Sequence, residues 1–358
     1  MVEMLGIPCS SDHLRKVARG VYEAHEYYSQ NAVGADSNNQ VNELKQERYK
    51  IQTEKLEYNR WLRESARDDL IAEHICQAIS ALEPLDIPPL RQKYYNSRAG
   101  VLLFGDEHYG VEFGIPGLDG EIINAYSPEI FERRMWDLLD ETVAIVEREG
   151  FDEIEVFSMG DFQDGVLRVG QLWKLRYGVV EGTVKYAQFI TNWLNELTKH
   201  VRVNYQMTRG NHTELRMLGQ PKGTFKDDNM SRVVEAWVED RLADNPNFTF
   251  TQNPTGLIYT KIFDYNVAGI HGEVKKMSQA IKDFSNTYKV QIDYFISGHK
   301  HHAYKEEVGI NREVLGVPSI MGSENFSMSI NKTASAGATF VIFEDGKGKT
   351  VEYAIKLR

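Results

Sequence analysis

Five short polar motifs occur in this chain, and each one directly follows an apolar run that is typical of a buried β-strand. In chain order they are Asp106-Glu107-His108, Gly160-Asp161-Phe162-Gln163-Asp164, Gly210-Asn211-His212, His271-Gly272 and Gly298-His299-Lys300-His301. In open α/β folds, ligands bind beyond the carboxyl ends of the parallel strands. The motifs therefore predict an α/β fold that gathers their side chains at one site.

The chain after Pro89 alternates predicted strands with predicted helices. The strands that precede the motifs are Val101–Phe104, Ile154–Phe157, Val201–Met207, Tyr265–Ile270 and Tyr294–Ile296. Helices are expected over Ser127–Gly150, Val180–Leu197, Met230–Ala243 and Val274–Tyr288. Three more strands follow at Glu313–Ser319, Ala338–Glu344 and Val351–Leu357. Alternating units followed by a cluster of strands indicate two packed sheets.

The N-terminal part contains no predicted strand. Two helices are expected, Ser11–Tyr28 and Gln40–Leu82, with a polar loop over Ser29–Asn39 between them. Prolines at positions 84, 88 and 89 then end the helical pattern. We therefore predict a helical N-terminal region at residues 1–92 and a second domain at residues 93–358.

The second predicted helix contains no Gly or Pro, and Leu44, Ile51 and Tyr58 repeat along it at intervals of seven. Arg48 and Lys55 occupy the alternate positions of that row, which a strict coiled coil would fill with apolar residues. One interpretation is a solvated helix with one face packed on its neighbour. The other is an arm that forms a homo-oligomer or engages nucleic acid.

Hydropathy, cysteine content and net charge indicate where the protein is located and which partners it can have. No apolar run reaches the roughly 18 residues of a membrane helix, so no membrane association is expected. Only Cys9 and Cys76 are present, outside the motifs, which favours a reducing cytoplasm. The formal net charge of −11 argues against a surface built for long duplex contacts, although a local basic groove can coexist with it.

The motifs supply carboxylate, amide and imidazole donors. Asp161 is a short carboxylate that suits bridging two cations. This mixture suits Mn, Fe or Zn better than Ca²⁺, which prefers cages of oxygen. We expect two divalent ions, with Mn²⁺ first and Fe, Zn or Mg as alternatives.

Together the motifs resemble the calcineurin-like metallophosphoesterase superfamily, over roughly Val101 to His302. Its pattern is Asp-x-His, Gly-Asp-x-x-Asp, Gly-Asn-His, a His often followed by Gly, and Gly-His-x-His, and this chain keeps every element. The resemblance implies an αββα sandwich of two β-sheets flanked by helices, here with an α-helical N-terminal extension. It also implies a dinuclear-metal-dependent phosphodiesterase that hydrolyses phosphoester bonds with a metal-activated hydroxide.

The resemblance implies a role for each motif residue. One metal ion would be held by Asp106, His108 and His301, and the other by Asn211, His271 and His299. Asp161 would bridge the two ions. His212 would protonate the leaving oxygen or stabilise the transition state, oriented by Asp164. Glu107 and Lys300 are expected to face solvent.

The expected substrate is a nucleic-acid or nucleotide phosphodiester. A DNA nuclease similar to the Mre11/SbcD DNA repair exonucleases of bacteria or phages is the leading hypothesis. The segment Leu172–Tyr177 interleaves aromatic and basic residues and is a candidate for base stacking, or alternatively an amphipathic helix with its aromatics in the core.

Other activities remain open. A nucleotide or cyclic-nucleotide phosphodiesterase is the alternative, favoured by the acidic net charge. A phosphoprotein phosphatase is disfavoured because Gly165 stands where that branch carries an arginine. A binding or assembly protein that works through its N-terminal helices ranks last.

Overall fold

The computed structural model describes residues 11–30, 35–92, 96–165, 173–215, 221, 228–324, 327–328 and 333–358. The chain divides into two compact units, Met1–His74 and Ile75–Arg358. All strands found among the described residues belong to the second unit. The boundary predicted between residues 92 and 93 stays a prediction. No helix in the described ranges combines the length and apolar character that crossing a membrane requires.

Two helices form the N-terminal part, α1 (Ser11–Gln30) and α2 (Ala35–Ser80). Both predicted helices are confirmed, but the loop predicted over residues 29–39 is too long. Residues 35–39 already belong to α2, and residues 31–34 lie outside the described ranges. The polar side chains that suggested a loop are Asp, Ser and Asn, which are also favoured at the start of a helix.

The larger unit contains a 6-stranded sheet in the order β13-β12-β1-β4-β5-β6. Its strands are β1 (Arg98–Phe104), β4 (Glu153–Ser158), β5 (Arg202–Met207), β6 (Phe248–Phe250), β12 (Gly337–Glu344) and β13 (Gly348–Lys356). The strands β1, β4, β5 and β6 run parallel, whereas β12 pairs antiparallel with β1 and β13 pairs antiparallel with β12. The carboxyl ends of β1, β4 and β5 therefore lie at one edge.

A 5-stranded sheet in the order β10-β11-β9-β8-β7 packs against the first. Its strands are β7 (Ile258–Ile262), β8 (Tyr265–Ile270), β9 (Tyr294–Ser297), β10 (Tyr304–Gly309) and β11 (Arg312–Gly316). The pair β8 and β9 is parallel, so these two strands also end together. A separate hairpin consists of β2 (Phe113–Pro116) and β3 (Ile122–Tyr126).

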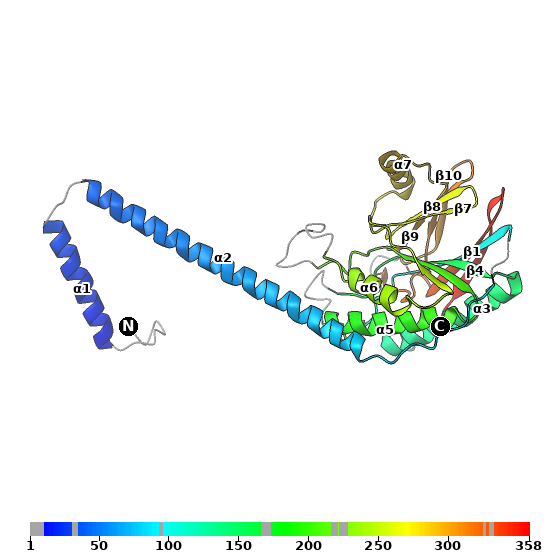
Figure 1. Ribbon diagram of the computed structural model, residues 1–358, viewed down its shortest axis with the longest axis horizontal. Helices are drawn as coiled ribbons and strands as arrows, with labels where there is room; N and C mark the ends of the chain where they lie inside the picture. Colours follow the sequence, from blue (N-terminus) through cyan, green and yellow to red (C-terminus); the bar gives the residue numbers. More distant parts are fainter. Residues whose placement is uncertain are drawn as a thin grey trace. The chain divides into compact units, whose positions relative to one another are not determined.

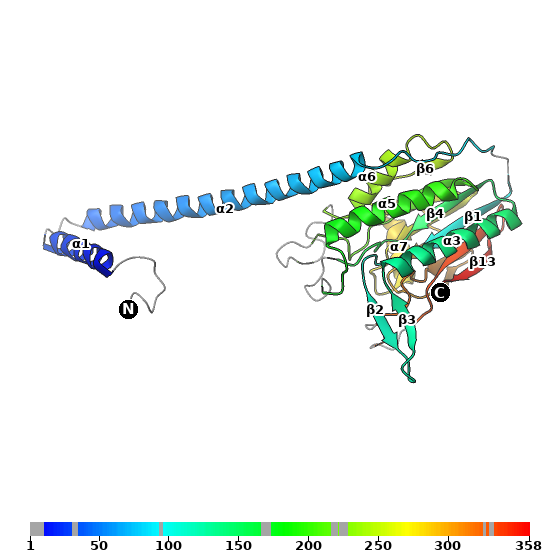
Figure 2. The same cartoon turned by 90° about the horizontal axis from the view of Figure 1, so that it is seen from below.

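Helices cover the outer faces of both sheets (Figures 1 and 2). The helices are α3 (Pro128–Glu149), α5 (Val179–Leu197), α6 (Ser231–Arg241) and α7 (Met277–Tyr288). The first three share one apolar core with the larger sheet, and α7 packs on the smaller sheet. The predicted αββα sandwich is confirmed.

Side-chain alternation along β1 shows why the layers form. Leu102 and Phe104 point into the core beneath the helices, whereas Val101 and Leu103 point into the core between the sheets. Successive side chains of a strand face opposite sides, so a strand buried on both sides needs a continuous apolar run. The sequence of β1 supplies that run.

The ends of α3 follow from local sequence. Ser127 caps the first turn, because its hydroxyl accepts a hydrogen bond from the backbone N–H of Ile130 at 3.3 Å. Pro128 occupies the first turn, where its missing N–H is not needed. Gly150 ends the helix in the left-handed region, at φ 73°. The predicted helix is confirmed at both ends.

Five strands were not expected from the sequence: β2, β3, β6, β7 and β10. The strand β6 has only three residues, and β10 is a charged edge strand with the sequence Tyr-Lys-Glu-Glu-Val-Gly. Neither has the apolar run that marks a buried strand. These two segments form strands because each pairs with a neighbouring strand, β6 with β5 and β10 with β11.

Trp193 links α5 to α3, and its replacement tests the helical layer. Its indole Nε1–H donates to the carbonyl oxygen of Met135 at 2.6 Å, and its side chain is fully buried. We expect Trp193→Ala to lower the free energy of unfolding by about 3–5 kcal/mol in urea titrations followed by circular dichroism. Trp136→Ala, at an exposed site on α3, should cost about 1 kcal/mol or less. Equal losses would contradict this account.

Candidate metal centre

Each of the five motifs lies in the loop that follows a strand. Residues 106–108 follow β1, 160–164 follow β4, 210–212 follow β5, 271–272 follow β8, and 298–301 follow β9. These strands belong to two different sheets. The prediction that the motifs lie beyond the carboxyl ends of strands is confirmed, and packing of the sheets brings them together.

Asp106, His108 and His301 form the first cluster of donor atoms. Asp106 Oδ1 lies 3.4 Å from His301 Nε2 and 3.9 Å from His108 Nε2. The two imidazole Nε2 atoms are 3.3 Å apart. One carboxylate and two imidazoles at these separations can coordinate one cation.

Asp161, His271 and His299 form the second cluster. His271 Nε2 lies 2.8 Å from Asp161 Oδ2 and 3.2 Å from His299 Nδ1. It is also 4.0 Å from Asp106 Oδ1, so the two clusters are adjacent. His271 Nδ1 donates to the carbonyl oxygen of Met159 at 2.8 Å, which leaves Nε2 facing the cluster.

Three buried oxygen atoms face this centre: Asp106 Oδ1, Asp161 Oδ2 and Asn211 Oδ1. Asp106 Oδ1 and Asn211 Oδ1 accept no hydrogen bond, whereas Asp161 Oδ2 lies 2.8 Å from His271 Nε2. The second oxygen of each carboxylate is held by a backbone N–H, Asp106 Oδ2 by His299 and Asp161 Oδ1 by His212, both at 2.8 Å. Burying an oxygen without a partner costs about 1–3 kcal/mol. Divalent cations would satisfy all three, and the residues fit two such ions.

The backbone of the motif loops is strained at the same places. Among the described residues, eight non-glycine residues have positive φ, and five of them are Asp106, His108, Asp161, His299 and His301. Left-handed backbone is unfavourable for residues with a Cβ and persists where surrounding contacts impose it. The strained backbone of these loops therefore directs their side chains towards one another.

Close approach of two loops explains one motif glycine. A Cβ on Gly210 would lie 2.0 Å from Asp161 Oδ1 and 2.2 Å from the backbone nitrogen of Asp161. No real Cβ tolerates such distances. Glycine at this position is therefore required for the loop after β5 to reach the carboxylate after β4.

The imidazoles of the centre differ in protonation. Burial lowers the pKa of His108 to about 4 and that of His299 to about 4, so both are neutral near pH 7, the form that binds metals. Burial alone would lower the pKa of His271, but the charge of Asp161 and its hydrogen bond raise it to about 9. Without a cation, protonated His271 neutralises Asp161.

His212 and Asp164 form a pair at the edge of the centre. His212 Nδ1 is hydrogen-bonded to Asp164 Oδ1, and the His212 ring meets the His108 ring edge-on, with centroids 4.7 Å apart. Burial alone would lower the pKa of His212, but Asp161 and then Asp164 raise it. A positively charged imidazole, held by a carboxylate and facing the clusters, can donate a proton.

The structure gathers the sequence-predicted site residues in these loops and clusters. They are Asp106, His108, Asp161, Asp164, Asn211, His212, His271, His299 and His301. The placement brings the residues together, while the role of each as ligand or acid stays a prediction.

Glu107 corrects one expectation. It was predicted to face solvent as a spacer between two ligands, yet it is fully buried. Tyr186 donates its hydroxyl to Glu107 Oε1 at 2.7 Å, and Tyr126 donates to the Glu107 carbonyl oxygen. Burial raises the pKa of Glu107 to about 8. Asp106 and His108 point towards the donor clusters. Glu107 lies between them in the sequence and points the other way, into the core beneath the helices.

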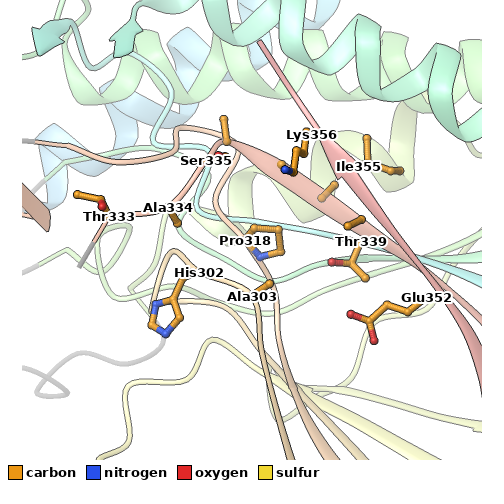
Figure 3. A pocket seen from close by; sticks show the side chains of 14 residues that line it. His302, Ala303, Pro318, Thr333, Ala334, Ser335, Thr339, Glu352, Ile355 and Lys356 are labelled. Atoms are coloured by element: carbon orange, nitrogen blue, oxygen red, sulfur yellow. The ribbon is translucent and has the colours of Figure 1, made fainter. Parts of the chain in front are cut away.

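His302 lines a separate hollow of about 590 Å³ (Figure 3). Its Nδ1–H donates to the carbonyl oxygen of Lys300 at 2.7 Å, which fixes the ring. Figure 3 shows His302 and Lys356 on opposite sides of this hollow. Lys300 lies partly exposed, with its Nζ 4.5 Å from the centroid of the Tyr304 ring.

A second hollow, of about 440 Å³, adjoins the metal-binding clusters. Asn211 and His271 line it together with Arg209, Leu257 and Val274. Arg209 Nε lies 3.7 Å from the buried carboxylate of Glu235. The lining also includes the carboxylates of Glu214 and Glu273. A hollow of this size and mixed lining beside the clusters can hold a small substrate group.

The aromatic and basic segment lies next to the first motif loop. Arg176 N–H donates to the Gly110 carbonyl oxygen at 2.9 Å, and Glu112 N–H donates to that of Lys174 at 3.0 Å. Residues 173–177 form turns and a bridge, so the alternative prediction of a helix is wrong, and residue 172 lies outside the described ranges. Trp173 is 85% exposed, as sequence alone could not have shown.

A family model described as the YonJ coiled-coil domain matches residues 41–82. The chain is 33% identical, over 356 residues, to the SPbeta prophage-derived uncharacterized protein YonJ of Bacillus subtilis (strain 168). The match covers 95% of this chain and 86% of that protein.

Several solved structures are similar to this chain at low identity. An archaeal phosphodiesterase is 13% identical, with 72% of this chain and 99% of that chain covered and a TM-score of 0.36. A dimetal phosphatase from Danio rerio is 9% identical, with 73% and 99% covered and a TM-score of 0.37. A metallophosphoesterase from Sphaerobacter thermophilus is 11% identical, with 73% and 89% covered and a TM-score of 0.31.

The buried acid Glu107 predicts a pH dependence of the metal-free protein. Its folded pKa of about 8 exceeds the ordinary value of 4.5, so the native state holds this proton more tightly than the unfolded state. Stability from this group is present below pH 4.5 and is lost as pH rises towards 8, by on the order of 3–5 kcal/mol.

Glu107→Gln removes this titration and keeps the shape of the side chain. We expect the variant to gain stability over the wild type between pH 5 and 8 in urea titrations with EDTA. Glu112→Gln, at an exposed carboxylate, is the control and should follow the wild-type profile. A constant difference between Glu107→Gln and the wild type across this pH range would refute a neutral Glu107.

Proposed function

We propose that this chain, which belongs to the YonJ family, is a metal-dependent hydrolase of phosphoester bonds. The observation that carries the proposal is the pair of adjacent donor clusters, together with the buried oxygens Asp106 Oδ1 and Asn211 Oδ1 that lack hydrogen-bond partners. Two divalent ions, when bound, polarise a phosphoryl group and lower the pKa of water. The residues of the chain then position the substrate and handle the proton.

The ligand assignment is part of the proposal. One ion is held by Asp106, His108 and His301, and the other by Asn211, His271 and His299. Asp161 bridges the two. Its support is that Asp161 Oδ2 lies 2.8 Å from His271 Nε2, which is itself 4.0 Å from Asp106 Oδ1 of the other cluster.

His212 is the proposed proton donor. Its Nδ1 is occupied by Asp164, and its Nε2 is the atom that faces Asp161. The carboxylate of Asp164 supports the charged imidazole, which raises the fraction that can donate near pH 7. His212 then protonates the leaving oxygen, and Asp164 positions it.

The proposed substrate is DNA, cleaved by a nuclease of the kind represented by Mre11/SbcD, with Mn²⁺ as the first candidate ion. Trp173 supports this choice, because an exposed indole beside the first motif loop can stack on a base. Arg209, whose Nε lies 3.7 Å from Glu235, lines the hollow next to the clusters and is the guanidinium proposed to contact a phosphate there.

A single nucleotide or cyclic nucleotide is the second candidate. The hollow of about 440 Å³ beside Asn211 and His271 favours it, since ligand pockets of this size hold small molecules. Phosphoprotein is the weakest candidate, because Gly165 takes the position of an expected arginine.

Two substitutions separate proton transfer from metal binding. We expect His212→Asn to keep both ions, measured by elemental analysis after dialysis, while turnover falls about 10²- to 10⁴-fold. Asp161→Ala should lose or scramble the ions. Metal loss in His212→Asn would show that His212 is a ligand. His200→Asn, at a histidine outside the motifs, is the matched control and should change neither property.

The substrate is tested with Mn²⁺ on single- and double-stranded DNA, cyclic nucleotides, mononucleotides and a phosphopeptide. We expect DNA cleavage, and Trp173→Ala should weaken single-stranded DNA binding by about 1–3 kcal/mol, raising KM rather than lowering kcat. Trp136→Ala, at the exposed tryptophan of α3, is the matched control. If cyclic nucleotides are cleaved while DNA stays intact, the proposed nuclease is wrong and the second candidate takes its place.

A further inference from the structure

An apolar row on α2 is exposed to solvent. Leu44, Ile51 and Tyr58 recur at intervals of seven and are 65%, 64% and 59% exposed. Side chains at this interval follow one face of a helix with a slow drift that a left-handed supercoil removes. A second helix is the natural partner for such a row.

Two cations lie within the same row. Arg48 and Lys55 occupy the alternate core positions of the heptad whose other core positions are Leu44, Ile51 and Tyr58. Covering them with an apolar helix would bury uncompensated positive charge, which is strongly unfavourable. The partner helix must therefore bring carboxylates to these two levels.

The chain places a carboxylate beside each cation. Glu47 directly precedes Arg48, and Glu54 directly precedes Lys55, in the heptad position that flanks the core. In a parallel two-stranded coiled coil, flanking residues of one helix lie next to core residues of the other at the same level. A second copy would therefore supply acids at both levels where this copy supplies bases.

The helix α1 offers a poorer match. Its own apolar row consists of Val17, Val21, Ala24 and Tyr28. The positions that flank this row are Ala18, Gly20, His25 and Tyr27. None of them is a carboxylate, so α1 would leave Arg48 and Lys55 without counter-charges.

The geometry points to a parallel, in-register homodimer formed by α2 of two copies of this chain. Leu44, Ile51 and Tyr58 form its apolar seam. Arg48 pairs with Glu47 of the partner subunit, and Lys55 pairs with Glu54 of the partner subunit. The match of residues 41–82 to a coiled-coil family model covers this whole segment. The inference is independent of the proposed hydrolase activity.

The oligomeric state of the full chain is the first test, by sedimentation equilibrium. We expect a dimer whose dissociation constant rises at least about 100-fold in Ile51→Asp, because the seam cannot bury a carboxylate. Thr53→Asp places the same side chain on the opposite face of α2 and should stay within about 3-fold of the wild type. A monomer or a higher oligomer in the wild type would overturn the proposal.

Charge exchange is the second test. Arg48→Glu with Lys55→Glu sets acid against acid across the seam and should give monomers. Adding Glu47→Lys and Glu54→Lys restores opposite charges and should restore the dimer. Circular dichroism shows whether α2 stays helical in each variant. If the variant with Arg48→Glu and Lys55→Glu stays dimeric, the proposed register is refuted. It is also refuted if the variant with all four substitutions stays monomeric.

Orientation is the third test, in a background with Cys9 and Cys76 replaced by Ser. A parallel in-register pair places position 51 of one copy next to position 51 of the other. Ile51→Cys should therefore form an intermolecular disulfide on mild oxidation, whereas Thr53→Cys should not. Efficient cross-linking of neither, or equally of both, would rule out this arrangement.

Discussion

Two backbone-to-carboxylate hydrogen bonds hold the metal centre together. His212 N–H binds Asp161 and so ties the loop after β5 to the loop after β4. His299 N–H binds Asp106 and so ties the smaller sheet to the larger one. Each bond occupies one oxygen and leaves the other facing the donor clusters, Asp106 Oδ1 without a hydrogen-bond partner and Asp161 Oδ2 beside His271 Nε2. The centre therefore exists only when both sheets are packed, and its donor atoms are fixed before any cation binds.

Such a centre is costly to fold. Buried oxygens without partners, left-handed backbone at the ligand positions and a buried acid all oppose the native state. The cores between the layers offset these terms, with β1 contributing to both. In the metal-free protein the ion pair of His271 with Asp161 compensates part of the buried charge. Divalent ions would take over that role, which links metal binding to stability.

The two compact units have different proposed roles. The larger one holds every donor cluster found among the described residues, so the proposed reaction belongs to it. The exposed row on α2, which is the seam of the proposed dimer, lies in the other. Polar spacing alone left α2 open to several interpretations. The proposed dimer follows from the carboxylates of Glu47 and Glu54, which flank the row at the levels of Arg48 and Lys55.

The sequence by itself determined the chemistry of the donors and the places where strands stop. Local signals were sufficient for α3, whose capping residues adjoin it in the sequence, and for β1 and β9, which contain continuous apolar runs. They were not sufficient for β10 or for the hairpin of β2 and β3, which depend on pairing. Only the tertiary structure placed Glu107 in the core and Trp173 in solvent. Burial depends on which distant elements cover a residue, and the packing of two sheets decides that.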